Sequence, residues 1–228
     1  MCHVSIIEFF IEQARPEVFA GKRVLEVGSK YVNGSVRPFI EKFLHPKEYI
    51  GIDIEPGIFV DIVMPAEKIL DYFGPESFDV VISTEVLEHV KDWRLVINSM
   101  KGVLRPEGYI YITTRSRGFP YHGYPHDFWR YEPSDMEVIF SDFKIECMRI
   151  DHMGPGVFLI AKKPREWKAT DLTNVALYSI LLGRRTKDIP SINDMPMSRR
   201  LMHKLLSSKA RWLMLRALRR TLERYYDM

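Results

Sequence analysis

The stretch that decides the fold is VLEVGSKYVNGS, Val24–Ser35, in which a short apolar run typical of a buried strand leads directly into a glycine-containing loop. Similar runs rich in Val, Ile and Tyr follow it, at 48–54, 59–63, 78–84 and 108–114. Helical candidates separate these runs, at 35–44, 65–73 and 92–104. Strands that alternate with helices of about ten residues predict a doubly wound α/β fold, with a parallel sheet covered on both faces.

The last two strand candidates of this region are 142–151 and 154–163, and only a turn around Gly154-Pro155-Gly156 separates them. Such a short connection predicts an antiparallel hairpin, because parallel neighbours need a long crossover. We therefore expect a mostly parallel seven-stranded sheet that finishes with an antiparallel pair. This ending departs from an all-parallel dinucleotide-binding sheet.

Charge divides the chain into two parts. Residues 1–161 hold 17 Lys and Arg against 24 Asp and Glu, a net charge of −7, whereas residues 162–228 hold 16 against 6, a net of +10. Parts of opposite charge face different partners. We therefore expect a core domain over 1–163 and a basic helical extension over 164–228.

Cysteine usage and hydropathy bear on the compartment. The two cysteines, Cys2 and Cys147, make neither a disulfide framework nor a metal-ligand pair. The first 20 residues mix acidic side chains with apolar ones, and no stretch reaches the roughly 18 apolar residues of a membrane span. These features predict a cytoplasmic protein, with peripheral membrane association as an option.

The loop after the first strand predicts a ligand site. In a doubly wound sheet a ligand binds at the carboxyl ends of the strands. Gly28 and Gly34 would let the backbone approach it closely, and Glu26 supplies a carboxylate, which favours a cation over a pyrophosphate. Asp53 ends the second strand, where it can accept hydrogen bonds from both ribose hydroxyls of a nucleoside. A nucleoside with a positive charge fits S-adenosyl-L-methionine.

Four segments, VLEVGSKYVNGS, YIGIDIEPG, SFDVVISTEVLEHV and LRPEGYIYITT, resemble in their order and spacing the S-adenosyl-L-methionine-dependent methyltransferases of the Rossmann-like class, most closely the type-11 group. The resemblance covers residues 20–162. It implies that Asp53 binds the ribose and that Ile54 lies beside the adenine. The other cofactor contacts that it implies are Glu26, Gly28, Ser29, Gly34, Met64, Ala66, Ser83 and Thr84.

This sequence departs from the family pattern in two places. Ser29 stands where the family often has a second glycine. After the third strand, Met64-Pro65-Ala66-Glu67 replaces the acidic residue that commonly binds the adenine.

The segment TRSRGFPYHGYPHDFWRYEPSDM, Thr114–Met136, is too rich in aromatic residues, His and Arg for an ordinary solvated loop. Aromatic walls with a few polar groups suit a polyhydroxylated ring, and HGYPHDFWRY resembles the loop of methyltransferases from sugar and polysaccharide biosynthesis. We therefore predict O-methylation of a sugar or another small hydroxylated acceptor. The residues expected to bind it are Arg115, Tyr124, Trp129 and Arg130, with the arginines directed at a phosphate or carboxylate.

An alcohol acceptor has to lose a proton, so a general base within hydrogen-bond reach would help. His126, followed directly by Asp127, is the first candidate for this base, and His122 is the second. In the alternative interpretation these residues only tie the loop down, while Trp129 and its neighbours fill the edge of the core.

The pair Glu88-His89 in EVLEHV resembles an acid–base pair, but a structural role for His89 is favoured. No paired His or Cys residues stand at ligand spacing, so no metal site is expected.

The basic extension predicts two further helices, at 170–183 and 197–226. A basic amphipathic helix over 199–226 favours contact with a membrane surface, where a lipid-linked glycan could be the acceptor. Packing against its own domain or in a homodimer is the alternative, and nucleic acid is disfavoured because no nucleic-acid module is present. Two other functions stay open, an RNA- or lipid-directed methyltransferase and a catalytically silent cofactor-binding scaffold.

Overall fold

The computed structural model describes residues 3–122 and 126–191. The chain divides into two compact units, Met1–Ile189 and Pro190–Met228. The change of composition after residue 163 does not coincide with this division. The predicted helix at 197–226, with its expected membrane or homodimer contact, lies outside the described residues, as does Tyr124.

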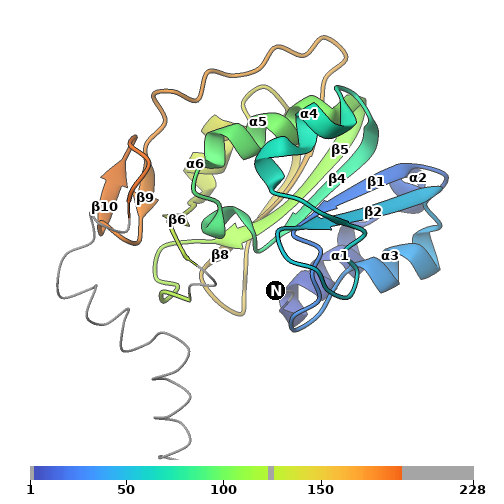
Figure 1. Ribbon diagram of the computed structural model, residues 1–228, viewed down its shortest axis with the longest axis horizontal. Helices are drawn as coiled ribbons and strands as arrows, with labels where there is room; N and C mark the ends of the chain where they lie inside the picture. Colours follow the sequence, from blue (N-terminus) through green and yellow to red (C-terminus); the bar gives the residue numbers. More distant parts are fainter. Residues whose placement is uncertain (1–2, 123–125, 192–228) are drawn as a thin grey trace, which may run out of the picture. The chain divides into compact units, whose positions relative to one another are not determined.

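The first unit is built on a seven-stranded sheet of order β3-β2-β1-β4-β5-β8-β7 (Figure 1). The strands are β1 (Arg23–Val27), β2 (Glu48–Asp53), β3 (Ile62–Val63), β4 (Phe78–Thr84), β5 (Leu104–Arg115), β7 (Lys144–Ile150) and β8 (Gly156–Lys162). Neighbours from β3 to β5 are parallel, and β8 is antiparallel to both β5 and β7. The predicted fold, with its closing antiparallel hairpin, is confirmed.

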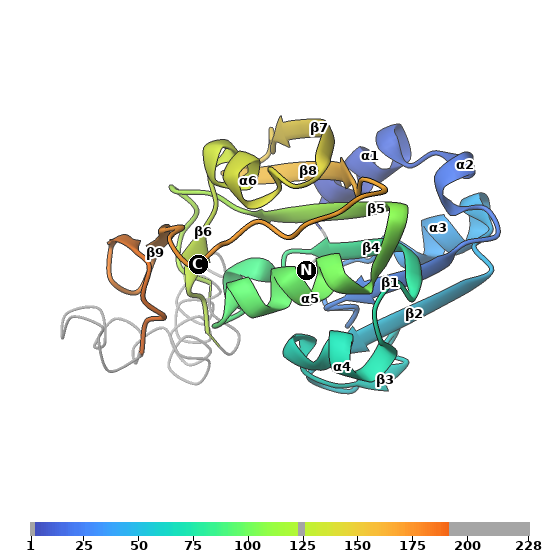
Figure 2. The same ribbon diagram turned by 90° about the horizontal axis from the view of Figure 1, so that it is seen from above.

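Helices cover both faces of this sheet (Figures 1 and 2). One face carries α1 (Val4–Gln13), α2 (Pro16–Phe19) and α3 (Arg37–Leu44), and the other carries α4 (Ile69–Phe73), α5 (Trp93–Val103) and α6 (Pro133–Ile139). The inner strands are mostly apolar, and six of the seven residues of β4 are buried, whereas no residue of the edge strands β3 and β7 is buried. Double coverage explains the pattern of the inner strands, because their side chains leave water on both faces of the sheet.

The prediction of a helix at 170–183 is wrong. Part of this segment is a strand, β9 (Leu177–Ser179), which pairs with β10 (Arg184–Thr186) and with β6 (Trp129–Arg130) in a second sheet. Arg94, at the start of α5, donates hydrogen bonds to the carbonyl oxygens of Leu172, Val175 and Lys187. These tertiary contacts and the free edge of β6 satisfy the backbone in an extended form, so they override the local helical pattern.

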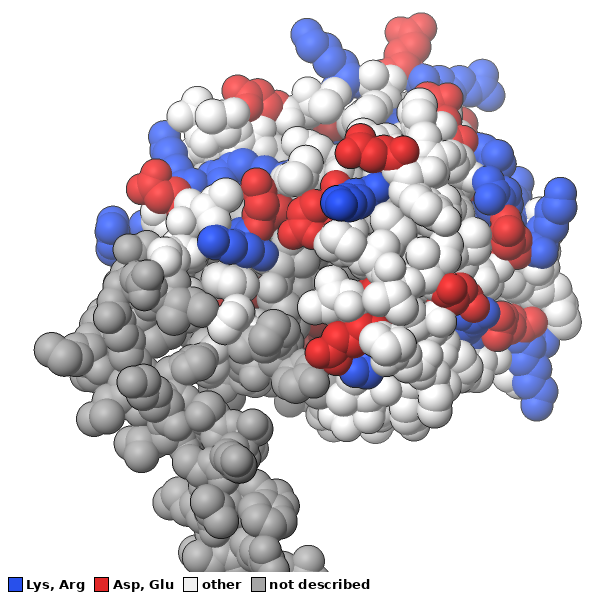
Figure 3. Space-filling view, in the orientation of Figure 1, with Lys and Arg blue, Asp and Glu red and all other residues white. Residues whose placement is uncertain are grey.

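On the face drawn in Figure 3, Lys and Arg side chains are interspersed with Asp and Glu side chains. The described part of the chain therefore presents no large field of one sign on this face. None of the helices among residues 3–122 and 126–191 is long and apolar enough to cross a membrane.

Candidate active site

The carboxyl ends of β1, β2, β4 and β5 meet at one edge of the sheet, and the loop after β1 lies there. The backbone N–H groups of Gly28 and Ser29 both donate to the carbonyl oxygen of Ile52, at 2.8 and 3.0 Å. Gly28 has a φ of 80°, and a Cβ at this position would lie 2.1 Å from a methyl carbon of Val86. The loop can therefore take this path only with glycine at position 28.

Glu26 is a carboxyl group inside the sheet, only 1% exposed. The Tyr49 hydroxyl donates a hydrogen bond to its Oε2 at 2.9 Å. Burial raises the pKa of Glu26 to about 7, although the Tyr49 hydrogen bond and the charge of Arg37 act in the opposite direction. A cation placed beside this group would therefore be held by a carboxylate that water screens poorly.

Two serine hydroxyls at the same edge are buried without a partner. Ser29 Oγ and Ser83 Oγ make no hydrogen bond to any other described residue. An unpaired buried hydroxyl costs about 1 to 3 kcal/mol, so an explanation is needed for both. A polar ligand that binds between the ends of β1 and β4 would satisfy them.

Asp53, at the end of β2, accepts hydrogen bonds from the backbone N–H groups of Lys30 and Glu55, at 3.3 and 3.1 Å. The Lys30 ammonium lies 2.5 Å from the Glu55 carboxylate, and the Tyr31 N–H donates to the carbonyl oxygen of Ile58, so the loops after β1 and β2 are joined by several contacts. The side chain of Ile54 is 58% exposed next to them, whereas Met64 is buried. The structure thus brings the predicted ribose-binding carboxylate to the predicted site.

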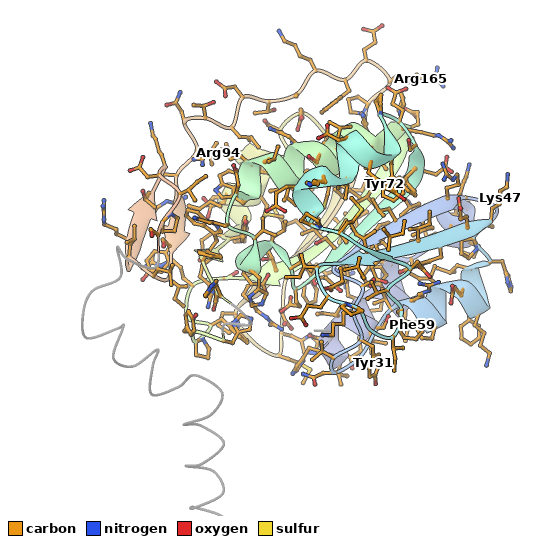
Figure 4. The ribbon with its side chains drawn as sticks, viewed as in Figure 1. Tyr31, Lys47, Phe59, Tyr72, Arg94 and Arg165 are labelled. Atoms are coloured by element: carbon orange, nitrogen blue, oxygen red, sulfur yellow. The ribbon has the colours of Figure 1, made fainter. Side chains whose placement is uncertain are left out.

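The remaining predicted cofactor residues lie around this edge. Thr84 is buried at the end of β4, Gly34 is half-buried before α3, and Ala66 is half-buried in the short helix η1 (Ala66–Lys68). Beside the β1 loop, Tyr31 and Phe59 form an edge-to-face pair with ring centroids 6.0 Å apart (Figure 4). The direct roles of Thr84, Gly34 and Ala66 in cofactor binding stay predictions.

Residues 127–130 of the aromatic loop after β5 are buried and make contacts inside the protein. Arg130 is fully buried. Its guanidinium donates to both oxygens of Asp127, at 2.5 and 2.7 Å, and to the carbonyl oxygens of Phe119, Pro120 and Trp129. The Trp129 indole is also buried and donates to the carbonyl oxygen of Lys91 at 3.2 Å.

Arg115 has a similar internal position. It forms ion pairs with Glu85 and with Asp151, and its guanidinium lies 4.3 Å from the centre of the Phe119 ring. For Arg115, Trp129 and Arg130, binding to a substrate stays a prediction. The contacts seen here are those that anchor the loop.

In the structure, the Asp127 carboxylate lies beside the ring of His122, the second candidate general base, and not beside that of His126, the first. Asp127 lies 3.0 Å from Nδ1 of His122, and its pKa is held at about 2 because Arg130 and His122 outweigh the effect of burial. His126 follows another course, since its carbonyl oxygen lies 2.6 Å from Nδ1 of His89 and its ring packs against Phe128. Asp127 therefore orients His122, the second candidate base, more directly than the first candidate.

His122 also brings this loop to the fully buried carboxyl group of Glu88, in the short helix η2 (Leu87–His89). Glu88 Oε1 lies 3.6 Å from His122 Nε2 and 3.9 Å from His89 Nε2, whereas Oε2 accepts a hydrogen bond from Thr114 at 3.0 Å. Burial would lower the pKa of His122, but Asp127 and Glu88 raise it to about 9. An unligated His122 ring therefore carries a proton at neutral pH.

The sequence did not indicate this cluster of Glu88, His89 and His122. Only the adjacent Glu88 and His89 are visible as a pair, and His122 comes from a loop after a different strand. Its partner Asp127, five residues further along, is the one local signal of an oriented imidazole.

A family model described as a methyltransferase domain matches residues 25–112, from β1 to β5. The ubiquinone biosynthesis O-methyltransferase of Vibrio atlanticus is 29% identical over 114 residues, which are 46% of this chain and 48% of that protein. A probable phthiotriol/phenolphthiotriol dimycocerosates methyltransferase 2 of Mycobacterium ulcerans is 31% identical over 119 residues, 47% of this chain and 44% of that protein. The chain spans about half the length of these curated relatives.

Among solved structures, the 1,6-didemethyltoxoflavin-N1-methyltransferase of Burkholderia thailandensis was determined with 1,6-didemethyltoxoflavin and S-adenosylhomocysteine. It matches with a TM-score of 0.51 at 12% identity, covering 64% of this chain and 72% of that one. At this identity the likeness establishes the fold. The chain thus has a Rossmann-like sheet, and its residues 25–112 match a methyltransferase domain.

Proposed function

We propose that this protein is an S-adenosyl-L-methionine-dependent methyltransferase that O-methylates a small hydroxylated acceptor, such as a sugar. The observation that carries the proposal is the polar edge formed by Glu26, Ser29 and Ser83, within a segment that matches a methyltransferase domain. A buried carboxyl group and two unpaired hydroxyls fit the charged amino-acid end of this cofactor.

Different residues of this edge would bind different parts of the cofactor. Glu26 would bind the ammonium group, and Ser29 and Ser83 would donate hydrogen bonds to the carboxylate. Asp53 would accept hydrogen bonds from the ribose hydroxyls, in addition to those that it accepts from two backbone N–H groups. When bound, the cofactor would supply a methyl group on a sulfonium: the acceptor oxygen would bond to the methyl carbon in line as the carbon–sulfur bond breaks, S-adenosylhomocysteine would leave, and the hydroxyl proton would pass to a base or to water.

The acceptor side of the proposal rests on the loop between β5 and α6. Arg130 binds Asp127 and the carbonyl oxygens of Phe119 and Pro120, so these described residues of the loop would be positioned before the acceptor binds. The Vibrio atlanticus relative is named as an O-methyltransferase, which supports oxygen as the methylated atom. The choice of a sugar, and of a polysaccharide pathway, rests on the resemblance of HGYPHDFWRY alone.

Calorimetric titration of the full chain with S-adenosyl-L-methionine and with S-adenosylhomocysteine tests the cofactor. We expect binding in the micromolar range that Asp53→Ala weakens by at least about tenfold, because two charge-assisted hydrogen bonds are lost. Glu48→Gln is the matched control, since Glu48 lies at the opposite end of the same strand and pairs with Arg23. Equal affinity in all three proteins, or no binding by the folded wild type, would refute the proposal.

An acceptor screen follows from positive binding, beginning with nucleotide sugars and lipid-linked glycans. Tight cofactor binding without turnover on any acceptor would favour the silent scaffold. The RNA- or lipid-directed alternative depends on residues 199–226, which lie outside the described residues, so it stays a prediction from sequence.

A further inference from the structure

The cluster of Glu88, His89 and His122 has the composition of a metal centre. One carboxylate oxygen and two imidazole nitrogens, all within 4.8 Å of one another, converge from η2 and from the loop after β5. Glu88 is fully buried, and its Oε1 makes no hydrogen bond to any of the described residues. A buried carboxylate oxygen without a partner is costly, and a cation would satisfy it.

The distances suit ligation better than hydrogen bonding. The separations of 3.6 and 3.9 Å between Glu88 Oε1 and the two Nε2 atoms exceed those of normal hydrogen bonds. Two ligands at about 2.1 Å from one ion lie about 3 to 4.2 Å apart, depending on the angle between them. Both observed separations fall within this interval.

The second nitrogen of each ring is already held in the way that metal-binding histidines require. Nδ1 of His89 lies 2.6 Å from the carbonyl oxygen of His126, and Nδ1 of His122 lies 3.0 Å from the Asp127 carboxylate. Donation from both Nδ1 atoms leaves the lone pair of each Nε2 directed at the cluster. Carbonyl and carboxylate partners of this kind orient imidazole ligands in metal sites.

We propose that Glu88, His89 and His122 bind one divalent transition-metal ion, such as Zn²⁺ or Mn²⁺. Two imidazoles and one carboxylate are a donor set that such ions accept, and three protein ligands leave positions open. One carboxylate leaves the ion with a net positive charge, so the open positions favour an oxygen ligand of the acceptor. This last role rests on the proposed function and would restrict the acceptor to molecules with a metal-binding hydroxyl.

The test uses the full chain, stripped with a chelator and freed of any affinity tag that binds metal. Calorimetry with Zn²⁺ and, separately, with Mn²⁺ should give one ion per chain for at least one of the two. We expect Glu88→Gln, His89→Gln and His122→Gln each to weaken binding by at least about tenfold. His152→Gln makes the same chemical change at an exposed site and should bind like the wild type.

Circular dichroism establishes that each variant is folded, and the two histidine variants decide the question if Glu88→Gln is not. Absence of binding by the wild type, or equal binding by all the variants, would overturn the proposal and favour a His122–Glu88 ion pair. Titration of the same samples with S-adenosylhomocysteine separates the two proposals, because metal binding and cofactor binding can fail independently.

Discussion

Replacement of Glu26 by Gln should change how the stability of the protein depends on pH. The pKa of Glu26 is raised from 4.5 to about 7, mainly by burial. Between these two values the unfolded chain loses this proton while the folded protein keeps it. The unfolded state then binds fewer protons, so the free energy of unfolding of the wild type falls as the pH rises through this window.

The size of the effect follows from the same two pKa values. Their difference corresponds to about 3 kcal/mol in total, of which about 2.5 kcal/mol falls between pH 5 and pH 8. Glu26→Gln has nearly the same shape, can still accept the Tyr49 hydrogen bond and does not titrate. The stability of this variant relative to the wild type should therefore increase by about 2.5 kcal/mol over that range.

Urea denaturation of both proteins without ligand, at pH 5, 6, 7 and 8, measures this difference. Titrations elsewhere in the chain cancel, because only the comparison between the two proteins is used. Tyr49→Phe serves as a second probe, since it removes a hydrogen bond to the ionised form and should steepen the loss of stability. A difference between wild type and Glu26→Gln that stays constant with pH would refute the reasoning.

Substitutions at Gly51 and at Arg130, each with a second substitution for comparison, test the packing and the charge pairing around the site. Gly51→Ala would place a Cβ 2.2 Å from the carbonyl oxygen of Phe59, so we expect a loss of about 1 to 3 kcal/mol in urea denaturation, whereas Gly154→Ala should be nearly neutral because its nearest contact is 3.7 Å. Arg130→Met leaves the buried Asp127 without its main partner and should cost about 3 kcal/mol or more. Adding Asp127→Asn should recover part of that loss, and purely additive losses in the same assay would contradict the assigned pair.

The central sheet could be predicted from sequence because two signals agree there. Strands β1 and β4 are apolar runs, and each is followed by a helical pattern of the right length, α3 after β1 and α5 after β4. The segment 170–183 lacks such agreement. Its helical pattern is local, but its backbone is satisfied by Arg94 and by the edge of β6, which are distant in sequence. Propensity alone could not predict those contacts.

The candidate site shows the same division between local and distant information. Glu26, Gly28 and Asp53 could be placed from sequence, because the ends of parallel strands meet at one edge whatever the details of packing. The side-chain partners within the aromatic loop could not be predicted in this way. His126 and Asp127 are adjacent in sequence, but Asp127 pairs with Arg130 and His122. Neighbouring residues in an irregular loop have no fixed side-chain direction, so adjacency gave the wrong partner.

The positions of buried polar atoms that lack a hydrogen bond link the cofactor proposal and the metal proposal. Ser29, Ser83 and Glu88 each bury a polar atom without a hydrogen bond among the described residues, and they lie after β1, at the end of β4 and in the short helix η2 that follows β4. A protein selected only for stability would replace such groups or pair them. Buried polar atoms without a hydrogen bond also occur elsewhere in the described residues, as in Ser5, Trp93 and Asn98. The position of Ser29, Ser83 and Glu88 at the edge where doubly wound sheets bind ligands nevertheless suits ligands that complete them. The cofactor would satisfy Ser29 and Ser83, and the metal ion would satisfy Glu88. Each ligand should therefore raise the melting temperature of the protein on its own.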